Sequence, residues 1–242
     1  MPQPEPRLRV ACVAPAWNEE NRIGPVVAAV PRDIVDEVVV VDDGSSDATS
    51  ERARAAGATV LRGAHSGVGA AIRMGIDYAI QQGYDVVVIV SGAGKTPPAQ
   101  IPRLLAPLLA GAEFAQGSRY TDGGERLHMT FSRKIGTRGY TFLFSLLVRR
   151  RVTDASSGFR AIRLSLFADK RIDIWQSWLD GYELEPYLLF QALRLRHKVV
   201  EVPVTIEYPN IARGQAYTKM RAWSDWYRIF RPVLFLALGL KR

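Results

Sequence analysis

Short apolar runs alternate with longer amphipathic stretches through the first 110 residues of the chain. Continuous Val-rich runs are typical of buried strands, and segments with a 3.6-residue apolar period are typical of helices. The predicted strands are residues 10–14, 37–41, 59–61 and 85–90. The predicted helices are residues 19–30, 46–56, 68–82 and 100–109. This alternation predicts an α/β fold built on an open, mostly parallel sheet with helices on both faces.

The second half of the chain is less regular. Residues 114–118 are predicted to form a strand and residues 137–148 an apolar helix, and residues 198–207 form a strand-like run that contains Pro203. Because proline cannot donate to a strand ladder, this last run belongs at an edge or a bulge. We find no linker, so residues 1–242 are predicted to be a single domain. We divide it into a nucleotide-binding half (10–110), an acceptor-side half (111–208) and a basic, aromatic C-terminal tail (209–242).

Polar residues follow each of the first predicted strands, where open α/β sheets bind their ligands. The second strand is followed by Asp42, Asp43 and Gly44. Two adjacent carboxylates are more than a helix cap requires, since Asp47 alone can cap the next helix. They are suited to accept hydrogen bonds from a ribose or from the edge of a base. The pair therefore predicts a nucleotide site, with a plain polar loop as the alternative.

Several short motifs, in this order and spacing, give the chain a wider resemblance. They are PAWNEE (15–20), VDDGSSD (41–47), HSGVGAA (65–71), GSRY (117–120), DASSGFR (154–160) and GYE (181–183). The first two resemble the opening motifs of family 2 glycosyltransferases, and the later ones resemble its dolichol-phosphate-mannose-synthase-like branch, from about residue 10 to 208. The resemblance implies a GT-A fold and inverting transfer of a sugar from a GDP- or UDP-linked donor.

The resemblance also implies which residues hold the substrates. Asp43 is expected to hold the base or ribose, Gly67 and Gly69 to let the backbone approach the donor, and Arg119 to lie near the diphosphate. The implied nucleotide-sugar residues are Pro15, Asn18, Glu20, Asp42, Asp43, Gly67, Gly69, Arg73, Ser91, Gly92 and Arg119. The implied sugar and acceptor residues are Arg133, Ser157, Gly158, Phe159 and Lys219.

The chain departs from the family where residues 91–95 read SGAGK. The family usually has Asp-x-Asp here to hold Mg²⁺ or Mn²⁺ against the diphosphate, and Ser91 and Ala93 replace both aspartates. Neither side chain anchors a hard divalent cation as a carboxylate does. We therefore expect no metal ligand here, and we expect Lys95 to neutralise the leaving group, helped by other basic residues. The candidate helpers are Arg119, Arg133, Lys134, Arg213 and Lys219.

A hydroxyl acceptor needs a general base, whereas a phosphate acceptor needs none. The family commonly places an acid within the segment that here reads DGYELE (180–185). Glu183 is our first candidate, Asp180 the second and Asp154 the third. Glu185 is interpreted as a surface or capping carboxylate.

The net charge of +8 is concentrated in two segments. Residues 126–151 hold seven basic side chains and no acidic one, and residues 205–242 hold seven basic and two acidic ones. Such segments suit a phosphate-rich ligand or an anionic membrane. The alternative is that the charge only keeps the protein soluble. The apolar stripe of residues 140–148 and the aromatic residues of the tail could lie in a membrane interface, or they could pack on the domain or on a second copy. The chain lacks any nucleic-acid recognition motif, so nucleic-acid binding is not expected.

These observations leave the acceptor open. We expect a soluble hydroxyl acceptor such as a nucleoside or specialised metabolite, with polyprenyl phosphate at a membrane surface as the first alternative. The second alternative is a non-catalytic nucleotide-sugar-binding protein. The single cysteine and the lack of a signal peptide or a ~20-residue apolar span favour a cytoplasmic protein, with peripheral contact to the membrane's cytoplasmic face as a variant.

Overall fold

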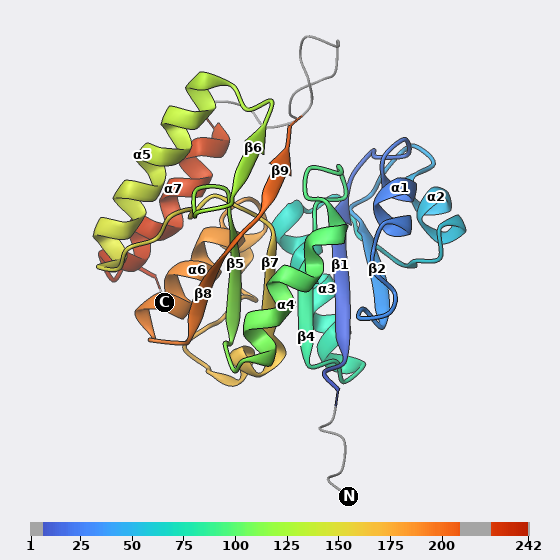
Figure 1. Cartoon of the computed structure of the whole chain (residues 1–242), viewed down its shortest axis with the longest axis horizontal. Coiled ribbons are helices and arrows are strands. Elements are labelled where there is room, and N and C mark those ends of the chain that lie inside the picture. The colour runs from blue at the N-terminus through green and yellow to red at the C-terminus, as the bar shows by residue number, and fades with distance from the viewer. Residues whose placement is uncertain (1–6, 209–223, 242) are drawn as a thin grey trace, which may run out of the picture.

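A computed structural model describes residues 7–208 and 224–241 of the chain (Figure 1). Seven strands form the main sheet, in the order β3-β2-β1-β4-β7-β5-β8. The strands are β1 (Val10–Ala16), β2 (Glu37–Asp42), β3 (Thr59–Arg62), β4 (Val86–Ile89), β5 (Phe114–Ser118), β7 (Arg160–Arg163) and β8 (Val199–Pro203). Only β7 runs antiparallel, between β4 and β5, so the mostly parallel sheet is confirmed.

Helices cover both faces of this sheet, as the sequence pattern predicted. One core cluster lies under α1 (Ile23–Ala28), α2 (Thr49–Ala55) and α4 (Ile101–Leu109). The other lies under α3 (Val68–Gln81), α5 (Phe131–Val148), α6 (Leu184–Arg194) and α7 (Ser224–Ala237). A small second sheet pairs β6 (Glu125–Leu127) with β9 (Thr205–Glu207). Short 3-10 turns lie at Pro98–Gln100, Leu164–Ala168 and Ser177–Leu179.

Several predicted boundaries in the first half were wrong; the helix expected from residue 46, for example, begins at Thr49. The helix expected from residue 19 begins only at Ile23, and the N–H groups of Glu19 and Glu20 donate to Thr49 and Asp47, which attaches this loop to the start of α2. Strand β1 continues through Pro15 to Ala16, where we expected Pro15 to stop it. The proline is tolerated because β4 pairs with β1 only as far as Val13. The missing N–H of Pro15 therefore faces no neighbouring strand.

The second half differs more from the expectation. The predicted strand at residues 114–118 is confirmed, and β8 lies at the sheet edge as Pro203 suggested. Helix α5 begins six residues earlier than predicted. The sequence pattern did not indicate β7, α6 or α7. Strand β7 has the sequence Arg-Ala-Ile-Arg, and its two arginines make it look unlike a buried strand. It is nevertheless an interior strand of the sheet, paired with β4 on one side and β5 on the other.

None of the helices in the described part of the chain combines the length and the apolar character needed to cross a lipid bilayer.

Candidate active site

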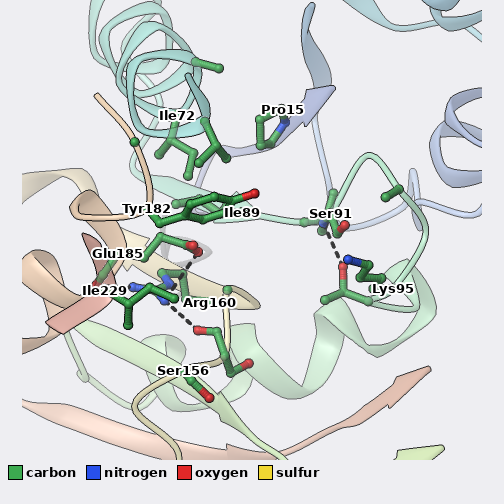
Figure 2. Close-up of a pocket in the computed structure, with 18 of the residues that line it drawn as sticks. Pro15, Ile72, Ile89, Ser91, Lys95, Ser156, Arg160, Tyr182, Glu185 and Ile229 are labelled. Carbon is green, nitrogen blue, oxygen red and sulfur yellow. Dashed lines mark hydrogen bonds and ion pairs between the residues drawn. The ribbon is translucent and has the colours of Figure 1, made fainter. Parts of the chain in front are cut away.

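A cavity of about 660 Å³ opens along the carboxyl ends of β1, β2 and β4 (Figure 2). Its walls come from the loops that follow these strands, from the start of α3, and from α5, α6 and α7. The cavity therefore joins the two halves of the chain. Six basic side chains line it (Arg22, Lys95, Arg119, Arg133, Arg160 and Arg228), against three acidic ones (Glu19, Asp43 and Glu185).

Asp42, which we expected beside the nucleotide, is instead a buried structural residue. Its side chain is fully buried and does not line the cavity. One carboxylate oxygen accepts the Ser45 N–H at 2.8 Å, and the other accepts the Ser50 hydroxyl and Arg62. Burial alone would raise the pKa of Asp42, but these hydrogen bonds and the Arg62 charge hold that pKa below its ordinary value. Asp42 thus fixes the loop that presents Asp43.

Asp43 does line the cavity, as predicted. Its carboxylate oxygens accept the backbone N–H groups of Ser66 at 2.8 Å and Gly67 at 2.9 Å. His65 lies 3.7 Å from the carboxylate and stacks on Trp17, with 4.5 Å between the ring centroids. The two stacked rings are partly exposed and offer a flat surface beside the Asp43 carboxylate. Such a surface suits a nucleobase.

Pro15 lines the cavity as expected, but Asn18 and Glu20 do not. The Asn18 side chain accepts the Ser46 N–H at 2.9 Å, and Glu20 accepts the Ala48 N–H at 3.2 Å. Both residues therefore join the loop after β1 to the loop after β2. Trp17, Glu19 and Arg22 are the residues of this loop that line the cavity.

Gly67, Gly69 and Arg73 were predicted to serve the donor, and each instead holds the segment before α6. A Cβ on Gly67 would lie 2.6 Å from the Asp180 carbonyl oxygen, and one on Gly69 would overlap the Leu179 carbonyl. Arg73 donates to the carbonyls of residues 174 and 176 and pairs with the Asp180 carboxylate. Of the three, only Gly67 also lines the cavity. Because Asp180 is committed to Arg73 and lies outside the cavity, it is not positioned to act as a base.

The loop after β4 carries Ser91 and Lys95 into the cavity wall, opposite Arg160 and Glu185 (Figure 2). The Thr96 hydroxyl accepts the Ser91 N–H at 2.8 Å and closes the loop. Gly92 does not line the cavity; its Cα packs against the Pro15 carbonyl, and a Cβ would lie 2.5 Å from that oxygen. This loop therefore supplies a hydroxyl and a cation, and no carboxylate.

Divalent-metal ligands of the usual kind are not grouped around this loop. Among the described residues no cluster of three or more His, Cys, Asp or Glu side chains is placed to hold a metal ion. Glu19 pairs with Arg22 at 2.8 Å, and Glu185 lies 3.5 Å from Arg160. The third acidic residue, Asp43, accepts backbone N–H groups. These donors do not fit a hard cation, which prefers several converging oxygens.

Asp154 and Arg119 form a buried ion pair at the cavity wall, and of the two only Arg119, a predicted site residue, lines the cavity. Arg119 Nε and a terminal nitrogen lie 2.6 and 2.7 Å from the two Asp154 oxygens, and both side chains are at most 2% exposed. Arg119 also donates to Ser156 and Tyr208. Burial would lower the pKa of Arg119, but the Asp154 charge outweighs it and raises that pKa. Asp154 is therefore a structural partner, which makes it unsuitable as the base we listed third.

Arg160 and Glu185 face the cavity together (Figure 2). Arg160 is buried and donates to the Glu185 carbonyl at 2.8 Å and the Ser157 carbonyl at 2.5 Å. Its Nε has no hydrogen-bond partner. Burial lowers the pKa of Arg160, although the Glu185 charge opposes this. Gly158 lies so close to Glu185 that a Cβ would meet its carboxylate at 2.5 Å.

Ser157 and Gly158 line the cavity as predicted, but Phe159 does not. The Phe159 ring is fully buried in the core on the other face of the sheet. The prediction placed three consecutive residues on one surface, which the extended backbone leading into β7 does not allow.

Glu183, our first candidate base, is also buried, and it does not line the cavity. It accepts a hydrogen bond from Arg231 of α7 at 2.9 Å. This pair ties the start of α6 to α7, which brings Arg228 and Ile229 to the cavity. Glu183 thus helps to position the part of the cavity wall that α7 forms.

Arg133 lines the cavity as predicted, with its guanidinium 5.0 Å from the Tyr208 ring centre. Lys219 and Arg213 lie outside the described residues.

The sequence analysis missed many cavity residues, among them Arg22, Arg160, Tyr182 and Arg228, and it interpreted Glu185 as a surface or capping carboxylate. The segment of residues 180–185 was correct, but the wrong carboxylates were chosen from it. The start of α6 at Leu184 decides which carboxylate faces the cavity. With this start Glu185 lines the cavity, whereas Glu183 points to Arg231 of α7. Nothing in the sequence pattern placed Arg228 beside the strands of the first half.

Comparisons with known proteins identify the family of the chain. A family model described as "Glycosyl transferase family 2" matches residues 11–169. An undecaprenyl-phosphate mannosyltransferase of Micrococcus luteus is 31% identical over 206 residues, which cover 82% of this chain and 83% of that protein. A polyprenol monophosphomannose synthase of Mycolicibacterium smegmatis is 29% identical over 208 residues, covering 83% and 78%.

Solved structures give the same fold. The glucosyl-3-phosphoglycerate synthase of Mycobacterium tuberculosis, solved with Mn²⁺, uridine diphosphate and glucosyl-3-phosphoglycerate, superposes with a TM-score of 0.69 at 22% identity. The match covers 97% of this chain and 81% of that one. The expected GT-A fold is thereby confirmed.

Proposed function

Because the chain belongs to glycosyl transferase family 2, in its dolichol-phosphate-mannose-synthase-like branch, we propose that it moves a sugar from a nucleotide-sugar donor to a polyprenyl phosphate. One observation carries this proposal: the cavity is lined by six basic side chains and three acidic ones, and the ion pairs of Arg22 with Glu19, Arg160 with Glu185 and Arg119 with Asp154 involve only three of the six. Such a surplus suits a reaction in which both substrates carry phosphate.

The donor end of the cavity is the part nearest Asp43, Trp17 and His65. A base that stacks against the Trp17–His65 pair would leave its diphosphate near the loop of Ser91 and Lys95. The sugar would then lie toward Ser157 and Gly158. GDP- and UDP-linked donors both fit this reading, because the described residues show a stacking surface without a set of groups that reads one base.

The transfer step on a phosphate acceptor needs no general base. A phosphate oxygen of the acceptor attacks the anomeric carbon, a new carbon–oxygen bond forms, and the bond to the nucleoside diphosphate breaks with inversion. The attacking oxygen is already anionic, so no proton has to be removed. This agrees with Asp154, Asp180 and Glu183, which all lie outside the cavity lining.

The acceptor proposal replaces our expectation of a soluble hydroxyl acceptor. The two curated relatives described above are named for polyprenyl-type phosphates, and each matches more than three quarters of this chain. The basic side chains at the acceptor end, Arg133 and Arg228, lie on α5 and α7 and suit an acceptor phosphate. A hydroxyl acceptor remains an outcome that the experiment below detects.

We further propose that basic side chains take the place of a divalent metal. The loop after β4 has Ser91 and Ala93 where the family usually has aspartates, it presents Lys95 two residues further on, and the cavity carboxylates are engaged elsewhere. Lys95 lies on the wall that would face the diphosphate, and it can balance the charge that develops on the leaving group. The cytoplasmic location stays a prediction.

A paired assay tests the proposed function. The full chain is first screened by thermal shift against GDP-, UDP-, CDP- and dTDP-sugars, because a ligand that binds the folded state raises the midpoint of unfolding. The stabilising donor, radiolabelled in the sugar, is then incubated with a short-chain polyprenyl phosphate or with a panel of nucleosides. We expect label in the lipid fraction. Label found only in soluble products would contradict the proposed polyprenyl-phosphate acceptor. A chain that binds none of the nucleotide sugars would contradict the proposed sugar transfer.

A further inference from the structure

Helix α5 turns a stripe of large apolar side chains away from the core. Phe131, Ile135, Phe142 and Leu146 are 75, 58, 73 and 63% exposed. At 100° per residue these four positions fall within about 60° of one another around the helix. The buried residues of the helix, such as Tyr140 and Phe144, lie on its opposite side. The exposure is therefore an organised stripe.

Helix α7 carries a second stripe of the same kind. Tyr227 and Leu234 of the helix, and Leu238 one residue past its end, are 62, 40 and 71% exposed, and the helical rotation places them within about 40° of one another. The two helices are neighbours in the layer that covers one face of the sheet (Figure 1), and the rings of Tyr140 and Phe230 meet with 4.9 Å between centroids. We call these seven exposed side chains the α5–α7 apolar face.

A cationic hollow lies at the carboxyl end of α5. It has a volume of about 580 Å³ and is lined by Arg149, Arg150, Arg151, Arg194, Arg196, Val148 and Leu193. The five arginines are exposed, and no acidic residue of the described chain is part of the lining. Arg194 also donates to the Leu236 carbonyl at 3.0 Å, which attaches the end of α7 to this arginine hollow.

Apolar side chains and arginines that share one surface suit a particular partner. Aliphatic and aromatic side chains can enter the boundary of a bilayer, while arginines bind the anionic headgroups beside it. A second copy of the chain fits less well, because Lys134 and Arg138 lie beside the α5 stripe and α5 contains no acidic residue, so two such faces would bring like charges together. We propose that the α5–α7 apolar face and the arginine hollow dock together on the surface of an anionic phospholipid bilayer.

The same two helices form part of the cavity wall, because Arg133 and Thr137 of α5 and Arg228 and Ile229 of α7 line the cavity. Arg133 and Thr137 lie on the side of α5 opposite its apolar stripe, so docking would place the bilayer against the outer side of helices whose inner side bounds the cavity. A lipid-borne phosphate would then reach the cavity around the edge of this helix pair. This use of the surface rests on the proposed function, whereas the docking itself does not.

Vesicle co-sedimentation of the full chain tests the proposal, with no sugar donor present. Vesicles of phosphatidylcholine alone are compared with vesicles that also contain phosphatidylglycerol. We expect binding to the anionic vesicles only, reduced by high salt. The double variants Phe142→Ser with Leu146→Ser, and Arg150→Gln with Arg151→Gln, should each lower the bound fraction at least fivefold.

Matched controls come from the other face of the sheet. Leu109→Ser removes an apolar side chain that is 69% exposed on α4, and Arg52→Gln with Arg54→Gln removes two charges from α2. Both should bind vesicles as the unaltered chain does, and the midpoint of thermal unfolding should show that all variants are folded. Equal binding by all variants, or no binding by the unaltered chain, would overturn the proposal. So would a dimer in solution that the Phe142 and Leu146 changes convert to monomer without any vesicle binding.

Because no donor is used, a failure of docking is distinct from a failure of the proposed function. A chain that transfers sugar to a detergent-solubilised polyprenyl phosphate but ignores vesicles would retain the function and lose the docking surface. A chain that binds anionic vesicles through these residues but transfers no sugar would do the reverse.

Discussion

The two halves of the cavity wall use their polar side chains in different ways. In the nucleotide-binding half, Asp42, Asn18 and Arg73 direct their hydrogen bonds to the chain itself. In the acceptor-side half and the tail, basic side chains such as Arg133 and Arg228 line the cavity. The motifs of the first half therefore build a frame, and much of the charge of the cavity comes from the less regular part of the chain.

The residues of the family motifs are therefore not the same set as the residues that line the cavity. Asp43 combines both uses in the first half, because it holds the turn at Ser66 and Gly67 and also lines the cavity. Asp154 is a frame residue of the second half, because it is a motif residue paired with Arg119. Changes to the frame should alter stability, and changes to the lining should alter turnover.

The largest expected effect concerns the buried pair in the acceptor-side half. Asp154→Ala leaves Arg119 buried without its counter-charge, and breaking such a pair costs about 3–5 kcal/mol of the free energy of unfolding. Denaturant unfolding measures this loss. If Asp154→Ala kept full stability and lost only turnover, Asp154 would belong to the chemistry and not to the frame.

A substitution at Lys95 tests whether the cavity lining of the nucleotide-binding half affects turnover. Lys95→Ala should lower kcat about 100- to 1,000-fold, as removal of one group that stabilises developing charge does elsewhere. Stability should stay within about 0.5 kcal/mol. Steady-state kinetics with the donor found by thermal shift measure the effect. The matched control is Lys170→Ala, at an exposed lysine outside the cavity lining; equal rates for the two variants would remove Lys95 from the account.

A substitution at Gly69, at the start of α3, tests whether the packing of the frame determines stability. Gly69→Ala puts a methyl group into the Leu179 carbonyl and should cost about 1–3 kcal/mol of the free energy of unfolding. Gly139→Ala in α5 is the control, because a Cβ there meets nothing within 4 Å. It should gain roughly 0.5–1 kcal/mol from better helix propensity. Equal unfolding midpoints for the two variants would show that the packing against residues 179–181 is not tight.

The smallest expected effect is also the most informative about the acceptor. Glu185→Gln should keep turnover with polyprenyl phosphate within about tenfold, because a phosphate oxygen needs no base. A loss of about 100-fold or more, together with loss of the acidic limb of the pH–rate profile, would make Glu185 a general base and point to a hydroxyl acceptor. Glu183→Gln is the control: it should lower stability through Arg231 instead.

Much of the fold followed from the sequence, because Val-rich runs and helical periods are local signals. Strands β2 and β5 and helix α3 lie within one residue of their predicted bounds. Strand β7 was missed because its burial comes from two neighbours distant in sequence. The motifs located the cavity, but they did not tell which carboxylate faces it. That choice depends on where α6 begins and on the pairing of Glu183 with Arg231, and both are tertiary features.

The central claim is that side chains of this chain, and not a divalent metal, balance the charge of the diphosphate. The most direct measurement is the rate of sugar transfer by the unaltered protein in excess EDTA, compared with the rate in Mn²⁺ or Mg²⁺. The account predicts the same kcat within about twofold in all three conditions, since Ser91 and Ala93 offer no carboxylate ligand. Turnover that is abolished by EDTA and restored by Mn²⁺ would contradict it.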